Sequence, residues 1–308
     1  MDRIVVIANP VASQFTGGSH RDVMATLSNS HDVQAIWPSS ATEATDAAAL
    51  AVADGVGIVV AMGGDGMVHH VAQALVGTES TLGIIPVGTT NVVARILDLP
   101  SRPSRAARLI GSGSTPSLLG VATMHLSRGA IETEHHAVFA CGFGLDAEVV
   151  IEADRDPYRK YRFGSIHYGR TALGVGLRKF PSRKPHLEVT AGDRSSHASA
   201  ALLQFRDIYT YFGKIPIRLN TVVPDPMTAL VLEQLKRRRI PRIAISALSG
   251  RELGNVDGIE VWDAVKSIEV VANPPVAAQA DGESLGMVDA ARVDWNADSL
   301  RVVSQTSI

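Results

Sequence analysis

The first third of the chain alternates short β-branched runs with stretches of helical composition, and this alternation constrains the fold more than any other feature. Parallel strands need a long crossover between them, which is usually a helix. The predicted strands are residues 4–8, 33–36, 58–61 and 82–86, and the predicted helices are residues 21–27, 43–53, 69–75, 92–96 and 104–110. We therefore expect an α/β fold that opens with a doubly wound, mostly parallel sheet covered by helices on both faces.

From about residue 120 extended segments dominate, and turn signals separate them. Expected strands are residues 121–126, 132–139, 186–191, 198–205, 215–219, 229–235, 243–247, 258–261 and 267–271, with one helical insertion near 164–179. This pattern is typical of an antiparallel β-sandwich or barrel. We expect an N-terminal domain over 1–121 and a β-sandwich domain over 122–294, with the tail 295–308 returning to the first domain.

Composition narrows the possible functions. The 308 residues are 45% hydrophobic and carry a formal net charge of −2, so no global basic field favours nucleic acid. A single cysteine, Cys141, excludes an internal disulfide and a multi-cysteine zinc site, and its apolar neighbours indicate a core residue in a reducing compartment. No apolar run approaches membrane-spanning length and no signal peptide is recognisable, so we expect a soluble or peripheral protein.

A glycine-rich turn follows the third predicted strand, where Gly63, Gly64 and Gly66 surround Asp65. Glycines allow close backbone approach to a ligand, and the amide groups of the following helix favour an anion. A carboxylate among anion-binding donors makes sense where a metal ion or a hydroxyl proton lies between it and a phosphate. The alternative is a tight βα turn in which Asp65 caps the helix.

A second turn of this kind follows the fourth predicted strand, with Gly88, Thr89, Thr90 and Asn91. The hydroxyl and amide groups could donate to phosphate oxygens, or they could be ordinary helix caps. Because the βα loops of an open sheet converge at the carboxyl ends of its strands, we expect both turns to face one crevice.

Six motifs in order make the chain similar to the diacylglycerol kinase catalytic family, which includes sphingosine kinases and bacterial lipid kinases and is related to NAD kinases and phosphofructokinases. They are the Asn-Pro turn at 9–13, Gly-Gly-Asp-Gly at 63–66, the second loop at 86–91, Cys-Gly-Phe-Gly-Leu-Asp-Ala at 141–147, the basic segment at 162–168, and Asp-Gly-Glu at 281–283. The resemblance covers nearly the whole chain.

The resemblance implies ATP and Mg²⁺ as cofactors and an Asp65-bound metal. It also implies that Glu283, with Asp281 beside it, comes from the second domain as general base for a lipid hydroxyl, while Asp281 and Gly282 could instead form only a hairpin turn. The implied catalytic residues are Glu283, Asp281 and Asp65. The implied nucleotide-binding residues are Asn9, Pro10, Val11, Ala12, Ser13, Thr42, Gly63, Gly64, Asp65, Gly66, Met67, Val68, His69, Gly88, Thr89, Thr90 and Asn91.

The sequence departs from the family pattern at several positions. Met67 replaces a threonine near the phosphates, and Val92 replaces an aspartate. The acidic turn by which many bacterial relatives hold a second, structural Mg²⁺ corresponds to residues 224–229, where only Asp225 is acidic. A hard cation needs several oxygen ligands, so we expect this structural site to be lost.

Basic and aromatic residues crowd residues 155–184, and a second basic run covers 236–239. Cationic side chains near anionic headgroups, together with interfacial aromatic residues, favour docking to a membrane surface. The alternative is a solvated helix face. We expect a cytoplasmic, peripherally membrane-associated protein that does not bind nucleic acid and could form a homodimer through an edge strand.

These observations predict an ATP-dependent lipid kinase that phosphorylates the hydroxyl of diacylglycerol or a related lipid. Two alternatives remain open at this point. One is a kinase of the same superfamily with a soluble substrate, such as an NAD kinase. The other is a catalytically silent protein that binds a lipid or a nucleotide, which the changes at Met67 and Val92 favour.

Overall fold

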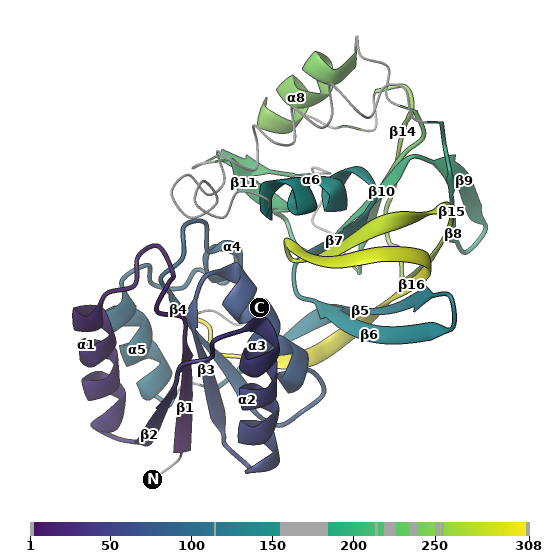
Figure 1. Ribbon diagram of the computed structural model, residues 1–308. Helices are drawn as coiled ribbons and strands as arrows, with labels where there is room; N and C mark the ends of the chain where they lie inside the picture. Colours follow the sequence, from purple (N-terminus) through teal and green to yellow (C-terminus); the bar gives the residue numbers. More distant parts are fainter. Residues whose placement is uncertain are drawn as a thin grey trace. The chain divides into compact units, whose positions relative to one another are not determined.

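The computed structural model describes residues 3–113, 115–154, 184–212, 215–218, 226–234, 239–249, 253 and 256–305. The chain divides into two compact units (Figure 1). Unit 1 contains Met1–Val121 and Ala297–Ile308, and unit 2 contains Ala122–Asn296. The chain therefore passes between the units twice, once in each direction.

The sheet of unit 1 is parallel. Its strands are β1 (Arg3–Ala8), β2 (Asp32–Ile36), β3 (Ile58–Gly63) and β4 (Thr81–Pro86), in the order β4-β3-β1-β2. The end of the last strand, β16 (Glu283–Val302), adds to this sheet in parallel beside β4, where Arg301 pairs with Thr81 and Val302 with Leu82. The carboxyl ends of β3 and β4 thus lie next to each other, because Gly63 pairs with Pro86.

Five helices accompany this sheet among the described residues: α1 (Gly17–Ser28), α2 (Ala41–Ala53), α3 (Asp65–Leu75), α4 (Val92–Ile96) and α5 (Pro103–Gly111). Helix α1 packs against α5, and α2 packs against α3, on the two sides of the sheet (Figure 1). Helices α1 and α2 begin earlier than predicted because Thr16 and Ser40 cap them. Strand residues such as Val6, Val60 and Ile85 are fully buried beneath the helices.

Unit 2 is built mainly from antiparallel strands. They are β5 (Ser117–Arg128), β6 (Ile131–Ala137), β7 (Ala140–Phe143), β8 (Leu187–Ala191), β9 (Arg194–Ala198), β10 (Ala200–Gln204), β11 (Thr210–Phe212), β12 (Ile215–Ile217), β13 (Thr228–Leu232), β14 (Ile259–Trp262), β15 (Ser267–Ala280) and the first part of β16. The main path runs β14-β13-β10-β7-β15-β16, and its pairs are antiparallel. The α/β class, with a parallel N-terminal sheet and antiparallel C-terminal strands, is confirmed.

Two helices of unit 2 lie among the described residues, α6 (Leu145–Asp154) and α8 (Ile240–Ser249). Helix α8 corrects the sequence analysis, which expected a strand at residues 243–247. A short apolar run fits either structure, and Pro241 suits the first turn of a helix. The side chain of Ile245 is exposed whereas Ser246 is buried, so the apolar alternation of a strand does not describe this segment. The helical insertion expected at 164–179 lies outside the described residues.

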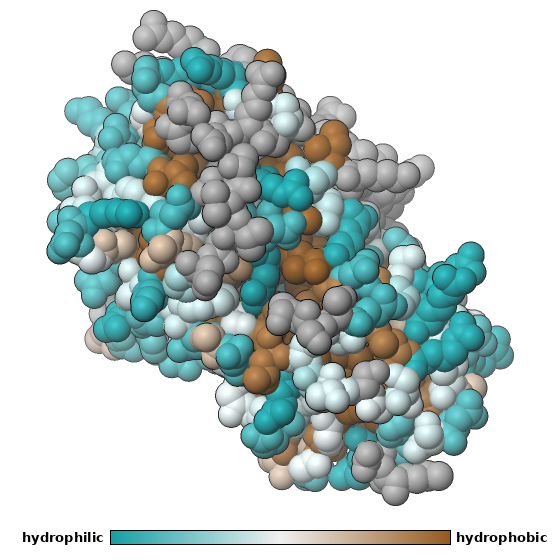
Figure 2. Space-filling view, turned by 180° about the vertical axis from the view of Figure 1, so that it is seen from behind, coloured by the Kyte–Doolittle hydropathy of each residue, from teal (hydrophilic) through white to brown (hydrophobic). Residues whose placement is uncertain are grey.

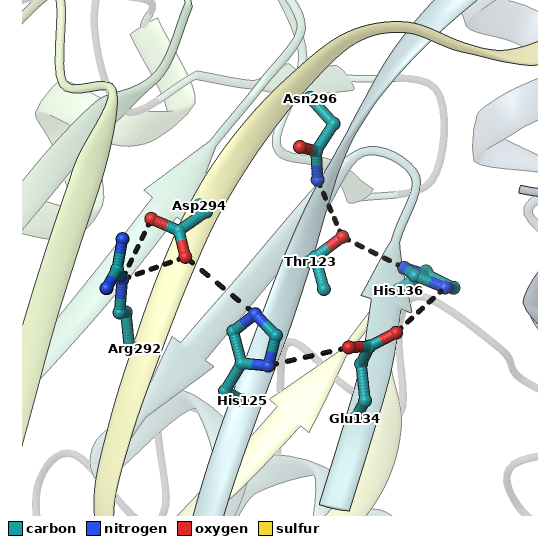
Figure 3. Close-up of polar contacts among 7 residues, drawn as sticks. All are labelled: Thr123, His125, Glu134, His136, Arg292, Asp294 and Asn296. Carbon is teal, nitrogen blue, oxygen red and sulfur yellow. Dashed lines mark hydrogen bonds and ion pairs between the residues drawn. The ribbon is translucent and has the colours of Figure 1, made fainter. Parts of the chain in front are cut away.

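A ladder of polar side chains joins β5, β6 and β16 close to where the chain passes between the units (Figure 3). Asn296 Nδ2 donates to Thr123 Oγ1 at 2.7 Å, and Thr123 Oγ1 lies 3.1 Å from His136 Nδ1. His125 lies between Glu134, at 3.5 Å, and Asp294, at 3.8 Å. These contacts link the two strands that carry the chain into and out of unit 2.

Exposed apolar side chains are scattered over the described part of the surface. On the face drawn in Figure 2, hydrophilic residues cover most of the visible surface and apolar residues form small, separate patches. The large apolar side chains that are most exposed, including Val11, Leu50, Ile131 and Ile245, belong to different elements, and singly scattered ones are normal for a protein surface. Within the described part of the chain, no helix has the length and apolar character needed to cross a membrane.

Candidate active site

The start of helix α3 differs from the starts of α1 and α2. Thr16 accepts a hydrogen bond from the amide of Ser19 in a capping box, and Ser40 accepts one from the amide of Glu43. At α3 the cap residue is Gly64, and no side chain caps the helix. Because the first amide groups of a helix have no carbonyl partner within it, this end of α3 offers backbone donors to an anion.

The two glycine turns touch each other through their backbones. A Cβ atom on Gly88 would overlap the Cα atom of Gly64, and a Cβ atom on Gly64 would lie 3.3 Å from the Cα atom of Gly88. A Cβ atom on Gly63 would likewise overlap the side chain of Met67. Glycine is therefore required here for close backbone packing, and the two turns form one continuous surface at the carboxyl ends of β3 and β4.

The side chain of Asn91 closes the second turn. Its Oδ1 accepts from the amide of Gly88 at 3.0 Å, and its Nδ2 donates to the carbonyl of Gly88 at 2.9 Å. Asn91 also has a positive φ of 50°, which asparagine tolerates better than most residues. Both polar atoms of the amide thus take part in bonds within the turn, and Asn91 stays a predicted nucleotide-binding residue.

The loop after β1 is tied to the second turn. Ser13 Oγ and Thr89 Oγ1 share a hydrogen bond of 2.8 Å, and the amide of Gln14 donates to the carbonyl of Val87 at 2.8 Å. Asn9 Oδ1 accepts from the amide of Val11, which shapes the start of this loop. The predicted residues at 9–13 and at 88–91 thus belong to one connected structure, whereas Thr42 lies exposed in the first turn of α2.

Asp65 caps a helix, although not the one that the sequence suggested. Its Oδ1 accepts from the amide of Val93 at 3.2 Å, so it caps α4 rather than its own helix α3. The carboxylate therefore links the first glycine turn to the helix that follows the second. A negative charge also lies beside the backbone donors of α3, where a cation bridging it to a phosphate would be stabilised.

Three of the predicted nucleotide-binding residues have side chains that are buried inside unit 1. Met67 is 8% exposed, Val68 is 2% exposed and His69 is 3% exposed. Only their backbones remain available to a ligand. The next residue, His70, is partly buried, and this burial, together with neighbouring His69, lowers its pKa to about 4.

The second predicted cluster forms the hairpin turn between β15 and β16. Asp281 and Gly282 both have positive φ, 53° and 83°, as a two-residue Asp-Gly hairpin turn requires. Asp281 is 4% exposed, and its carboxylate accepts from the amides of Val138 at 2.8 and 3.0 Å, Phe139 at 2.9 Å and Ala140 at 3.3 Å. These bonds anchor the turn to the connection between β6 and β7. The Asp281 carboxylate therefore holds the turn in place.

Glu283 directly follows this turn. It is the first residue of β16, pairs with Ala280 of β15 and has a half-buried side chain. Its position next to an anchored turn makes it the better candidate for a general base, because a base must be held in a defined place to act.

Comparison with known proteins shows a similarity to one family. The family model for the diacylglycerol kinase catalytic domain matches residues 3–120. A diacylglycerol kinase of Mycobacterium tuberculosis is 28% identical over 289 residues, which cover 91% of this chain and 88% of that protein. Residues 3–120 of this chain are therefore similar to the diacylglycerol kinase catalytic domain.

The chain is also similar to other proteins, in sequence or in fold. An uncharacterized protein of Synechocystis is 27% identical over 91% of this chain, which spans 65% of that protein's length. A Bacillus anthracis structure described as a candidate diacylglycerol kinase has a TM-score of 0.78 at 20% identity, covering 100% of this chain and 96% of its own. An Archaeoglobus fulgidus NAD kinase solved with ATP has a TM-score of 0.56 at 11% identity, covering 98% and 93%, which shows a shared fold alone.

The motif at 141–147 contains a partly buried polar residue whose partners the sequence analysis missed. Asp146 accepts hydrogen bonds from Tyr209 and Gln279. The signal for Gln279 was present, because it is the one polar residue in the apolar run Val276-Ala277-Ala278-Gln279-Ala280. A polar residue in a buried strand needs a partner inside the protein.

Several predicted family features lie outside the described residues. They include Pro224 and Asp225 of the degenerate acidic turn, most of the basic segment 155–184 and residues 236–238 of the second basic run. Arg239, which is described, pairs with Asp257. Within the described ranges, no group of three or more His, Cys, Asp or Glu side chains is arranged to hold a metal ion.

Proposed function

We propose that the protein is an ATP-dependent lipid kinase that transfers the γ-phosphate of ATP to the hydroxyl of diacylglycerol, giving phosphatidic acid. The observation that carries the choice of acceptor is the alignment with the Mycobacterium tuberculosis diacylglycerol kinase, which extends over 91% of the chain and so includes both units. The geometry of the glycine turn at Gly64 and of the hairpin turn at Asp281 and Gly282 supports phosphate transfer.

The first turn supports the binding of phosphates. The start of α3 lacks a side-chain cap and the backbone of Gly64 lies against Gly88, so phosphate oxygens could approach the amide groups closely. Asp65 would hold Mg²⁺ together with the phosphates, and the bound ion would neutralise charge on the transferring group. A single protein carboxylate fits this role, because Mg²⁺ is usually held by one or two carboxylates plus substrate phosphates.

The hairpin turn at Asp281 and Gly282 supports general-base catalysis by Glu283. An alcohol is too weak an acid to attack at neutral pH, so a carboxylate that accepts its proton as the new O–P bond forms assists the reaction. The proton of the lipid hydroxyl would pass to Glu283 while the bond from the γ-phosphorus to the leaving ADP oxygen breaks. Asp281, whose carboxylate is engaged by three amides, would keep the turn in place.

The proposed lipid acceptor also implies where in the cell the enzyme works. Diacylglycerol resides in a bilayer, so we propose that the enzyme works at the membrane surface as a peripheral protein. The basic and aromatic residues of 155–184 would supply the contacts with anionic headgroups.

Phosphate transfer from radiolabelled ATP to lipids in mixed micelles tests the function. The panel contains diacylglycerol, monoacylglycerol, a sphingoid base and phosphatidylglycerol, with NAD as a soluble acceptor. The proposal predicts label in phosphatidic acid. Label in another lipid would keep the lipid kinase and change the substrate, label in NADP would favour the NAD kinase alternative, and no label with ATP still bound would favour a silent binding protein.

A matched pair of substitutions tests the role of Asp65. Asp65→Asn keeps an oxygen that can accept from the Val93 amide but removes the charge, whereas Asp65→Ala removes both. We expect both variants to lose at least ~100-fold in transfer rate, with thermal stability preserved only in Asp65→Asn. Full activity in Asp65→Asn would show that Asp65 serves only as a cap.

A further inference from the structure

A largely buried polar network lies next to the turn that carries Glu283. Asp146, in the first turn of α6, accepts hydrogen bonds from Tyr209 Oη and from Gln279 Nε2 through the same oxygen, Oδ2. Gln279 then accepts a hydrogen bond of 2.8 Å through its Oε1 from the amide of Gly282. Figure 1 shows α6 lying across the strands of unit 2, and it packs chiefly against β15, which carries Gln279.

The donors and acceptors of this network allow only one orientation of the Gln279 side-chain amide. A carboxylate only accepts, so Asp146 requires its partners to donate. The Nε2 atom of Gln279 must therefore face Asp146, which turns the Oε1 atom toward the turn, where the amide of Gly282 donates to it. Asp146 thus fixes which end of the Gln279 amide meets the hairpin.

The sequence is adapted to hold a carboxylate at this position. A Cβ atom on Gly142 would lie 2.7 Å from Asp146 Oδ2, so only glycine leaves room for it. Burial raises the pKa of Asp146, although the hydrogen bonds from Tyr209 and Gln279 oppose this. Burial also raises the pKa of Tyr209 well above its ordinary value, so its hydroxyl keeps its proton and remains a donor.

Such a network is costly in a protein core. Burying polar groups destabilises a fold unless each is hydrogen-bonded, and apolar residues of similar volume often serve stability equally well. Its use here, two residues before Asp281 in the chain, therefore points to a need for a fixed geometry. The turn is held from two directions, by the bonds of the Asp281 carboxylate to β6–β7 and by the bond of the Gly282 amide to Gln279.

We propose that Asp146, Tyr209 and Gln279 are positioning residues that orient the turn presenting Glu283 to the acceptor hydroxyl. The inference rests on the proposed function, because it assigns Glu283 as the base. The three residues act through the turn and do not themselves touch the reacting atoms.

Variants at Gln279 separate positioning from simple stability. Gln279→Met keeps the approximate shape and removes both hydrogen bonds, so we expect kcat to fall by about 10- to 100-fold with KM for ATP unchanged. Gln279→Glu keeps an oxygen for the Gly282 amide, but at high pH it places a second buried charge beside Asp146. Once protonated it can donate to Asp146, so its activity relative to wild type should rise as the pH falls from about 9 to about 6.

Tyr209→Phe removes one donor to Asp146 and should give a smaller fall in kcat in the same direction. Ser80→Ala is the control, because it removes a buried hydroxyl that donates to Val56 at 2.8 Å in unit 1. We expect Ser80→Ala to lose some stability and to keep the kcat of wild type. A kcat for Gln279→Met equal to that of wild type, or a Gln279→Glu ratio that does not change with pH, would overturn the proposal.

Amide hydrogen exchange provides a readout that does not depend on kinase activity. The amide of Gly282 is protected by Gln279, so its exchange should be at least about 10-fold faster in Gln279→Met and intermediate in Tyr209→Phe. If wild-type protein transfers no phosphate to any acceptor, the proposed function fails, while faster exchange would still establish the network as the support of this turn. Unchanged exchange in Gln279→Met would overturn the positioning role in either case.

Discussion

The glycine turn at Gly64 in unit 1 and the hairpin turn at Asp281 in unit 2 are built in opposite ways. In unit 1, the turn at Gly64 leaves the start of α3 without a side-chain cap, and its carboxylate, Asp65, caps a neighbouring helix. In unit 2, the turn at Asp281 and Gly282 is tied by hydrogen bonds to Val138, Phe139, Ala140 and Gln279. A turn that binds phosphate can keep backbone donors for its ligand, whereas a turn that carries a base must be held by the protein itself.

The substitution that we expect to lower stability most is at Asp281. Asp281→Asn keeps one acceptor but turns an NH₂ group toward buried amide donors, which should lower the free energy of unfolding by about 3 kcal/mol. Urea unfolding followed by tryptophan fluorescence measures this, since Trp262 and Trp295 lie in unit 2. The control is Asp289→Asn, because Asp289 accepts from the amide of Gly129 at an exposed site. Equal, small effects of the two substitutions would contradict the anchoring role.

The next effect concerns the contact between the two glycine turns of unit 1. A methyl group at Gly88 would overlap the backbone of Gly64, which cannot move aside as a flexible side chain could. Gly88→Ala should destabilise unit 1 by about 2 kcal/mol and weaken ATP binding at least ~10-fold, as calorimetric titration would show. Gly57→Ala is the control, since its Cβ would meet nothing within 4 Å. Unaltered ATP affinity in Gly88→Ala would separate this surface from the nucleotide site.

His70 in α3 should make the stability of the protein depend on pH, with a smaller effect than the substitutions above. The pKa of His70 is lowered to about 4, first by burial and then by His69, so the unfolded chain binds a proton at His70 more readily than the folded protein does. Stability should therefore fall as the pH drops from about 6.5 to about 4, by about 2 kcal/mol once solvent screening of the partly exposed ring is included. His70→Gln should remove this part of the acid limb in denaturation curves recorded across that range. If His70→Gln lost stability between about pH 6.5 and about pH 4 as wild type does, other groups would cause the acid sensitivity.

The smallest effect sharpens the contrast between capped and uncapped helices. Thr16→Ala removes the capping box of α1 and should lower stability by about 1 kcal/mol. Because α1 is capped by its own side chain, ATP affinity should remain that of wild type. A loss of ATP affinity as large as that expected for Gly88→Ala would show that capping does not distinguish the two kinds of helix.

The sequence predicted regular elements well where one physical signal dominated. The strands and helices of unit 1 followed from β-branched runs and helical spacing, and the helix at residues 92–96 has the predicted bounds. The segment at 243–247 was assigned wrongly because five residues do not distinguish helical from strand periodicity. Long periodic patterns predict secondary structure, but whether a short apolar run becomes a helix or a strand depends on the residues that pack around it.

The candidate site was only partly predictable for a related reason. The glycine turns and the Asp-Gly-Glu hairpin are local in sequence, so their motifs reveal them. The bond from Asp65 to Val93 and that from Gln279 to Asp146 join residues far apart in the chain, and composition and spacing give no sign of them. The partners of Asn91 and Asp281 are likewise visible only in the folded chain.

The most direct test of the account measures ATP binding and phosphate transfer side by side in Glu283→Gln. If the glycine turns of unit 1 bind phosphates and the hairpin at Asp281 and Gly282 supplies the base, the Kd for ATP should stay within about twofold of wild type. Transfer to diacylglycerol should fall at least ~100-fold. Transfer at the wild-type rate by Glu283→Gln would contradict the account, because the anchored turn would then carry no catalytic group.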